Sequence, residues 1–162
     1  MKSEYGLAKD KYKRKAKGAL SAIEQVGTSG LSEDGRKNLD TGLKCGLVCQ
    51  DEVDHAQHNY MIAEANLALN NIAGRGKEKG DDVFLEYGLK HGEFNQDDID
   101  FKMGTYRKHR LLERVREFGI RNIQVSSVLD IWSAVNDGII PKKEYLEAVS
   151  YTHLTLPTTP YV

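Results

Sequence analysis

Two cysteines and two histidines lie within fourteen residues, in the segment CGLVCQDEVDHAQH that begins at residue 45. Their spacing is C-x3-C-x5-H-x2-H, over Cys45, Cys49, His55 and His58. Thiolates and imidazoles are the usual ligands of tetrahedral zinc, and a set of two of each is a common structural site. His55 and His58 are three residues apart, so a helix would place both on one face. These four residues are the candidate ligands of a zinc ion.

Basic residues form two clusters that could contact phosphate. The first is KDKYKRKAK, residues 9–17, and the second is KMGTYRKHRLLERVR, residues 102–116. The candidate nucleic-acid contacts are Lys9, Lys11, Lys13, Arg14, Lys15, Lys17, Arg107, Lys108, Arg110, Arg114 and Arg116. Lys and Arg neutralise phosphates whatever the base sequence, and Tyr12, Tyr60 and Tyr106 on the three long helices offer rings for base stacking. A solvated helix face, or a contact with the acidic residues of 80–100, is the alternative interpretation.

A nuclease is the enzymatic alternative. The segment FGIRNIQVSSVLDIWSAVNDGII, residues 118–140, resembles the closing part of some PIN-domain nucleases, and LDT at residues 39–41 resembles the motif of their first catalytic aspartate. The resemblance implies that Asp40 helps to hold a divalent metal at the end of a parallel sheet. However, no apolar strand precedes Asp40, and the chain has no phosphate-binding loop and no His-Glu-x-x-His motif. We therefore expect no enzyme activity and no cofactor.

The segments that carry these residues recur along the chain. The sequence LDTGLKCGLVCQDEVD, residues 39–54, aligns without a gap with LEYGLKHGEFNQDDID, residues 85–100, and eight of the sixteen residues are identical. A third copy lies at residues 131–146, so Gly46, Gly92 and Gly138 share a period of 46 residues. Such self-similarity is typical of repeat architectures.

Each copy predicts a short helix, a glycine turn and a long helix. The short helix of the first copy covers about residues 32–45 and ends at a glycine, which accepts a left-handed conformation. Ser32 and Ser127 are expected to cap short helices, and the capping positions of the long helices are Ser3, Cys49, Asn95 and Pro141. A long helix of about 24 residues then runs to Gly27, Gly74 or Gly119. Its apolar rows are Leu7/Val53/Ile99, Ala19/Ala65/Leu111, Ile23/Leu69/Val115 and Val26/Ile72/Phe118.

The predicted fold is therefore all-α, with helical-hairpin repeats of period 46. One helix pair cannot bury its apolar face alone, whereas stacked pairs can. A solenoid-like array and a closed helical bundle both satisfy this requirement, and both stay open. We expect a single domain over residues 1–148, with Trp132 and the apolar rows in its core.

The repeat also supplies an internal control for the zinc hypothesis. The residues that occupy the four ligand positions in the second copy are His91, Asn95, Phe101 and Gly104. The same turn is thus built without the ligand set, so the fold does not need a metal. The alternative interpretation is one small buried thiol, one thiol at a helix cap and two histidines near the surface.

The last residues differ from the rest of the chain. The segment VSYTHLTLPTTPYV, residues 149–162, has no charged residue and holds two of the three prolines. Residues 149–159 resemble the translation of the transposon-end adapter used in sequencing-library preparation, with a match at every position from Val149 to Thr158. The resemblance implies a non-native, disordered tail and a natural reading frame that was cut near Ala148. The Gly-Ile-Ile turn before it is similar to that of a short C-terminal helical domain of bacterial proteins.

Composition limits the function classes. The formal net charge is −1, so overall charge indicates no particular partner. The chain has no apolar run of the length that spans a membrane, and two cysteines without a secretory signal indicate a cytoplasmic protein. We expect a non-catalytic binding or assembly module whose partner is another protein or a second copy, with nucleic acid as the alternative partner.

Overall fold

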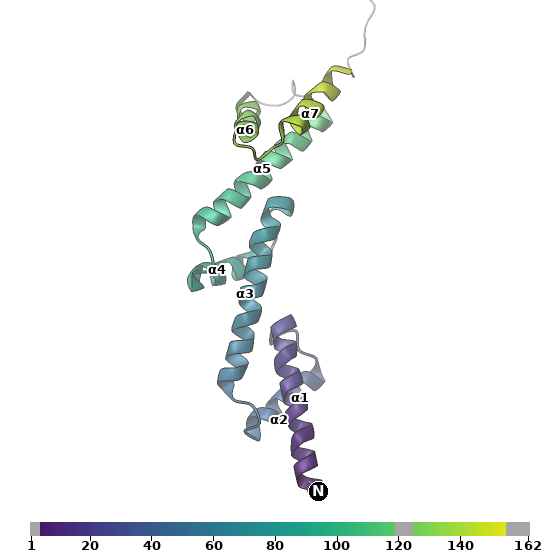
Figure 1. Ribbon diagram of the computed structural model, residues 1–162, viewed down its shortest axis with the longest axis vertical. Coiled ribbons are helices and arrows are strands. Elements are labelled where there is room, and N and C mark those ends of the chain that lie inside the picture. Colours follow the sequence, from purple (N-terminus) through teal and green to yellow (C-terminus); the bar gives the residue numbers. More distant parts are fainter. Residues whose placement is uncertain (1–3, 119–124, 155–162) are drawn as a thin grey trace, which may run out of the picture. The chain divides into compact units, whose positions relative to one another are not determined.

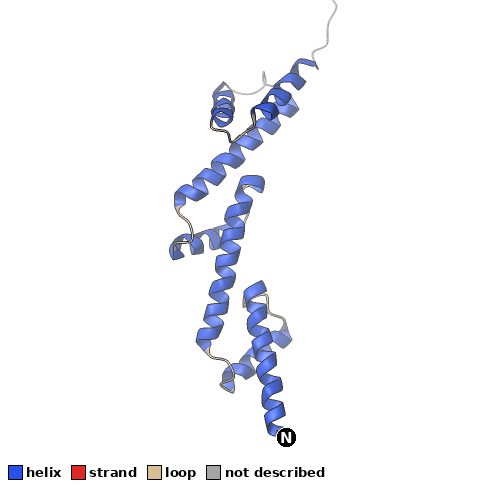
Figure 2. Cartoon of the chain, viewed as in Figure 1, coloured by secondary structure: helices blue, strands red, loops and turns tan. Residues whose placement is uncertain are grey.

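The computed structural model describes residues 4–118 and 125–154. Within these ranges every regular element is an α-helix and no strand occurs (Figure 1, Figure 2). The helices are α1 (Glu4–Val26), α2 (Glu33–Lys44), α3 (Gln50–Arg75), α4 (Asp81–His91), α5 (Gln96–Phe118), α6 (Val125–Asn136) and α7 (Lys142–Leu154). The prediction of an all-α fold is confirmed.

The chain divides by its contacts into two compact units, which are described separately. Unit 1 comprises residues 1–68 and 79–94, and unit 2 comprises residues 69–78 and 95–162. The helix α3 therefore contributes residues to both units. The single domain expected over residues 1–148 stays a prediction.

The three glycine turns have the same backbone geometry. Gly46, Gly92 and Gly138 lie in the left-handed region, at φ of 61°, 73° and 72°. The backbone N–H of the residue after each glycine donates to the carbonyl five residues before it. These bonds run from Leu47 to Gly42 (2.8 Å), from Glu93 to Gly88 (3.0 Å) and from Ile139 to Ala134 (2.9 Å). Glycine takes this conformation without a steric penalty, which is why it ends helices so often. The predicted turn is confirmed in all three copies.

Polar side chains fix the starts of the helices. The Ser32 hydroxyl accepts a hydrogen bond from the backbone N–H three residues further on, at 3.1 Å. Asn95 and Asp98 exchange two bonds, each backbone N–H donating to the other side chain, at 2.9 and 3.0 Å. These reciprocal bonds satisfy N–H groups that lack a partner within the helix. The predicted caps at Ser32 and Asn95 are confirmed, whereas Ser127 is not a cap, because α6 begins two residues earlier.

Each short helix of unit 1 packs closely against the long helix before it. A Cβ atom placed on Gly42 would lie only 2.6 Å from the Cβ of Ala16, and one on Gly88 would meet the Phe94 ring and lie 3.1 Å from the Cβ of Ala65. Only the absence of a side chain allows this approach. The pairs α1–α2 and α3–α4 are therefore helical hairpins held by a glycine facing an alanine.

A tyrosine joins each long helix to the end of the preceding one. In unit 1 the Tyr60 ring lies against Gly27, 2.6 Å from the position a Cβ would take, and in unit 2 Tyr106 lies in the same way against Gly76, at 2.7 Å. The backbone N–H of Thr28 also donates to the side chain of Gln57, at 2.8 Å. The sequence placed the end of α3 at Gly74, which is wrong, because the helix continues through Arg75 and the left-handed glycine is Gly76.

The period of 46 describes the turns but not the contacts of the long helices. The helix α3 has 26 residues, whereas α1 and α5 have 23 each. The two alanines that face a glycine, Ala16 and Ala65, are therefore 49 residues apart. Val26 is 45% exposed, whereas Ile72 is fully buried. The predicted apolar row that joins these two residues is thus wrong. Val26 is the last residue of α1, whereas α3 continues for three residues beyond Ile72.

Each unit has its own apolar core. The core of unit 1 contains Ala16, Ala19, Ile23, Leu31, Leu39, Val48, Val53 and Ala56. The core of unit 2 contains Leu112, Val115, Ile131, Ala134, Ile140 and Ala148. In both units the core side chains come from long and short helices together, so neither kind of helix buries its apolar face alone.

The helix α7 continues through Leu154, so residues 149–154 are helical where the sequence predicts disorder. A helix that has started adds residues at little cost until a breaker intervenes, and the first proline after it is Pro157. Residues 155–162 lie outside the described residues. The adapter origin of this segment stays a prediction.

The close approach within the first hairpin predicts the effect of one added methyl group. Gly42→Ala places a Cβ against Ala16, and we expect it to lower the free energy of unfolding by about 1–3 kcal/mol. Gly18→Ala is the matched control, because Gly18 is also helical but has no atom within 4 Å of the added Cβ. It should raise stability by up to about 1 kcal/mol through its helix propensity. Urea denaturation measures both, and equal stability of the two variants would contradict the packing described.

Candidate functional site

The two cysteines lie on either side of the first glycine turn. Cys45 is the C-cap of α2 and its backbone N–H donates to the carbonyl of Thr41, at 3.0 Å. The backbone N–H of Cys49 donates to a carboxylate oxygen of Glu52, at 2.9 Å. Both thiols are free and exposed. The expectation that one of them is buried is wrong, and the turn is held by backbone groups rather than by sulfur.

The two histidines of the proposed zinc set are directed elsewhere. His55 is exposed on α3, and His58 is half-buried with its Nδ1 2.8 Å from the hydroxyl of Tyr87. Because a helix rises about 1.5 Å per residue, His58 lies about 12 Å along the axis from the first residue of α3, too far to share an ion with Cys49. No cluster of three or more His, Cys, Asp or Glu side chains suited to a metal occurs among the described residues. The structure does not bring the four candidate ligands together.

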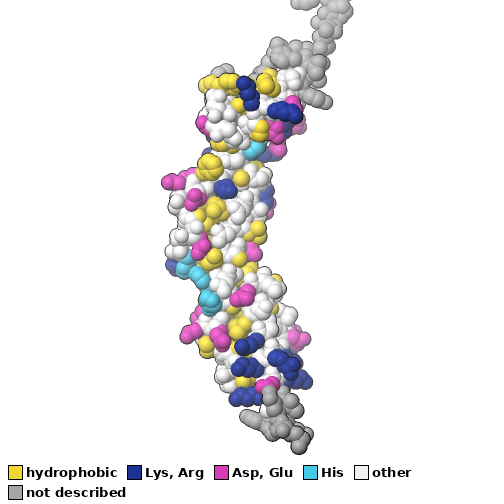
Figure 3. Space-filling view, in the orientation of Figure 1, with side chains coloured by type: hydrophobic (Ala, Val, Ile, Leu, Met, Phe, Trp, Pro, Cys, Tyr) yellow, Lys and Arg dark blue, Asp and Glu magenta, His cyan; other side chains and the backbone are white. Residues whose placement is uncertain are grey.

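Three rings instead form a cluster between α3 and α4. The ring centroids of His58 and His91 are 5.0 Å apart, and those of Tyr87 and His91 are 4.3 Å apart. Tyr87 and His91 are four residues apart on α4, a spacing that brings side chains together on a helix. Residue spacing alone does not predict this cluster, because it depends on the packing of α3 against the helix that follows it. Figure 3 shows histidines gathered at the surface.

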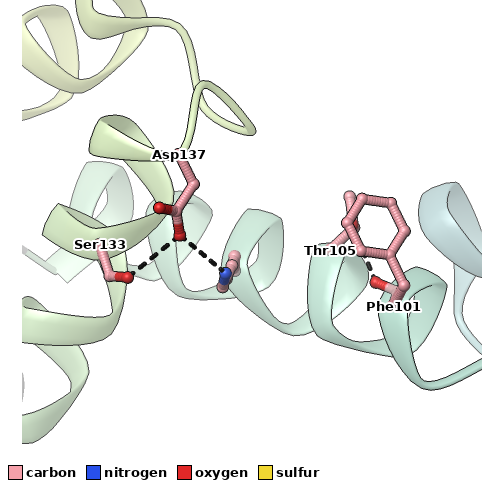
Figure 4. A network of polar contacts seen from close by, with 5 residues as sticks. Phe101, Thr105, Ser133 and Asp137 are labelled. Atoms are coloured by element: carbon pink, nitrogen blue, oxygen red, sulfur yellow. Dashed lines mark hydrogen bonds and ion pairs between the residues drawn. The ribbon is translucent and has the colours of Figure 1, made fainter. Parts of the chain in front are cut away.

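Unit 2 has a shallow groove between α5 and the turn after α6. It is lined by Asp100, Phe101, Gly104, Thr105, Lys108, Asp137 and Ile139. One carboxylate oxygen of Asp137 accepts a hydrogen bond from Ser133 at 3.2 Å and lies 3.9 Å from the ammonium group of Lys108 (Figure 4). Phe101 is 63% exposed. The groove thus combines an accessible phenyl ring with an ion pair.

The two basic clusters differ in their counter-charges. All six basic side chains of residues 9–17 are exposed, and within the described part of the chain none of them forms an ion pair. On α5, three of the five predicted contacts are paired, namely Lys108 with Asp137, Arg110 with Glu113 at 2.6 Å and Arg116 with Glu144 at 3.6 Å. Arg107 and Arg114 are exposed. Of the two predicted surfaces, only the cluster on α1 has no basic side chain paired with a carboxylate of the described residues.

An apolar strip lies on α6. Leu129 is 63% exposed and Trp132 is 47% exposed, and the two are three residues apart on one helix face. The ring of Tyr145, from α7, packs edge-on against the indole with centroids 5.8 Å apart. The expectation that Trp132 lies in the core is wrong, because Ile131 and Ala134 occupy the buried face of α6. We call Leu129, Trp132 and Tyr145 the α6 strip.

The structure does not supply the framework that the nuclease alternative requires. Asp40 lies on α2, where it is exposed. The ranges 4–118 and 125–154 contain no strand, and therefore no parallel sheet to hold metal-binding carboxylates. Residues 119–124, where the resemblance places a strand, lie outside the described residues.

Comparisons with protein-family models, with curated proteins and with solved structures found no match to this chain. No helix within the described ranges is long and apolar enough to cross a membrane.

The hydrogen bond between His58 and Tyr87 predicts a measurable contribution to stability. Tyr87→Phe removes the hydroxyl from a half-buried contact, and we expect it to cost about 0.5–1.5 kcal/mol of unfolding free energy. Tyr12→Phe is the control, because Tyr12 is 50% exposed and its hydroxyl has no hydrogen-bond partner among the described residues. Urea denaturation should show a change of less than about 0.5 kcal/mol for the control. Equal effects of the two substitutions would argue against the contact.

Proposed function

We propose that this chain is a non-catalytic, cytoplasmic binding or assembly module built from helical hairpins, with a protein as its partner. The three identical glycine turns support a repeated design, in which Gly42, Gly88 and Ala134 accept the same backbone bond. A repeated scaffold offers side chains at equivalent places that can vary without disturbing the fold. Two exposed, unpaired thiols fit a reducing compartment.

The α6 strip is the observation that carries the proposal. In the two earlier copies the position of Leu129 is occupied by Val83 on α4 and by Lys37 on α2. The position of Trp132 is occupied by Glu86 and Asp40. Three of these four residues are charged, so the scaffold does not require apolar side chains there. Exposed Trp residues flanked by other apolar groups are typical centres of protein interfaces. The strip therefore suits contact with an apolar surface of another protein.

The described interior is almost entirely apolar. Among the described residues, Asp81 is the single buried polar or charged residue. It lies in the first turn of α4, where a negative charge is stabilised by the helix dipole. No buried side-chain nitrogen or oxygen in the described part of the chain lacks a hydrogen-bond partner.

A photo-crosslinking experiment tests the proposed surface. Leu129 is replaced by p-benzoylphenylalanine and the chain is irradiated in extract of the cells that express it. Lys37, the exposed residue at the equivalent position of α2, receives the same replacement as the control. We expect position 129 to form a defined adduct with one protein, which is either another protein or a second copy of this chain. Position 37 should form no adduct.

The cross-linked protein is then purified and titrated against variants. Trp132→Ala and Leu129→Ala should each weaken binding by about 10-fold or more, as expected for residues at the centre of an interface. Tyr12→Ala, which removes an exposed ring from α1, should leave the affinity unchanged. Adducts of equal yield at both positions, or equal affinities of all three variants, would refute the proposed surface.

A further inference from the structure

The first half of α1 concentrates positive charge. Residues 9–17 contain six basic side chains and one acidic side chain, a net charge of +5, whereas the whole chain has −1, so the remaining residues together carry −6. Eight helical steps span about 12 Å, which gives about one basic residue per 2 Å. Duplex DNA carries one negative charge per about 1.7 Å of its axis. Each strand carries one charge per about 3.4 Å, so the charge spacing of this segment lies between that of a single strand and that of a duplex.

The basic side chains of this segment, which we call the α1 cations, are accessible. They are Lys9, Lys11, Lys13, Arg14, Lys15 and Lys17, and all six are exposed. Figure 3 shows Lys and Arg side chains gathered over this part of the molecule. In the described structure the α1 cations have no ion-pair partner, so no internal contact has to break before a ligand binds.

Most acidic residues near helix starts already have a structural role. Pairs of acidic residues occupy the first turns of α2, α3, α4 and α5. There the helix dipole stabilises them, and Glu52 and Asp98 also accept backbone hydrogen bonds. These carboxylates serve the helices that carry them, whereas the α1 cations take part in no ion pair within the described structure.

One of the α1 cations occupies the position at which α3 and α5 carry a half-buried tyrosine ring. Tyr60 and Tyr106 lie 46 residues apart and pack against glycines, and the residue 46 positions before Tyr60 is Arg14, which is exposed. Between Lys9 and Lys17 the apolar side chains are those of Tyr12 and Ala16, and Ala16 is buried. A helix that inserts into a membrane surface needs an exposed apolar face, and this segment does not have one.

Tyr12 indicates which polyanion fits best. Its side chain is 50% exposed in the middle of the α1 cations. Basic side chains interleaved with an accessible aromatic ring are typical of surfaces for single strands, where phosphates meet the cations and a base stacks on the ring. We infer that residues 9–17 of α1 bind the phosphate backbone of a single-stranded nucleic acid, with Tyr12 stacking on a base. This site is separate from the α6 strip, so the failure of either leaves the other intact.

Fluorescence anisotropy with the full chain and a labelled DNA strand of about 20 nucleotides tests the inference. With roughly four to six phosphate contacts, raising NaCl from about 50 to about 200 mM should weaken binding by about 50- to 300-fold. An absence of binding at the lower salt concentration would overturn the inference, as would an affinity that does not change with salt.

Charge-matched variants locate the site. The double variant Lys13→Glu, Arg14→Glu should weaken binding by more than about 10-fold at low salt. The control Arg107→Glu, Arg114→Glu makes the same change in net charge on exposed residues of α5, and should weaken binding by less than about threefold. Circular dichroism confirms that both variants keep their helices. Equal losses in the two double variants would overturn the assignment to α1.

The tyrosine distinguishes a nucleic acid from other polyanions. Tyr12→Ala should weaken binding of the single strand by about 5- to 100-fold, but that of a duplex by less than about twofold. Polyglutamate at the same charge concentration should compete poorly with the DNA strand. Full competition by polyglutamate, or equal losses of Tyr12→Ala on single strand and duplex, would overturn the inference.

Discussion

The close approach of a glycine in the short helix to an alanine in the long helix is the contact on which each hairpin of unit 1 depends. A Cβ atom on Gly42 would lie 2.6 Å from the Cβ of Ala16, and one on Gly88 would lie 3.1 Å from the Cβ of Ala65 and clash with the Phe94 ring. The helices can then bury their apolar rows together, because small residues at the crossing let the backbones come near. The left-handed glycine that ends each short helix returns the chain towards the next long helix.

This design leaves the residues around each turn free to differ. The turn is held by backbone hydrogen bonds and by glycine, so Cys45, His91 and Asp137 can occupy equivalent positions with different chemistry. The first is an exposed thiol, the second belongs to a ring cluster with His58, and the third accepts a hydrogen bond in a groove. Side chains that vary on a repeated backbone are typical of binding modules. The exposed α6 strip and the unpaired α1 cations show such variation over larger parts of two helices.

The turns and caps could be predicted from the sequence, whereas the surfaces could not. Gly46 and Asn95 act through local backbone geometry and hydrogen bonds, so their residue types and spacing were sufficient. The position of Trp132 depends on which face of α6 meets α5, and the exposure of Val26 depends on where α1 ends. The four zinc candidates do not come together, because Cys45 and Cys49 are exposed at the turn, whereas His58 lies further along α3 against Tyr87. Counter-charges such as Glu144 beside Arg116 also depend on tertiary packing.

Nuclear Overhauser effects on chain labelled in its alanine methyl groups test the central contact most directly. We expect a strong nuclear Overhauser effect between the Ala16 methyl group and the Hα protons of Gly42. We expect a second such effect between the Ala65 methyl group and the Hα protons of Gly88. The Phe94 ring protons should also reach Gly88. If both methyl groups instead show effects only to residues of their own helices, the hairpins are not closed by glycine–alanine contact, and the description of the fold given above is contradicted.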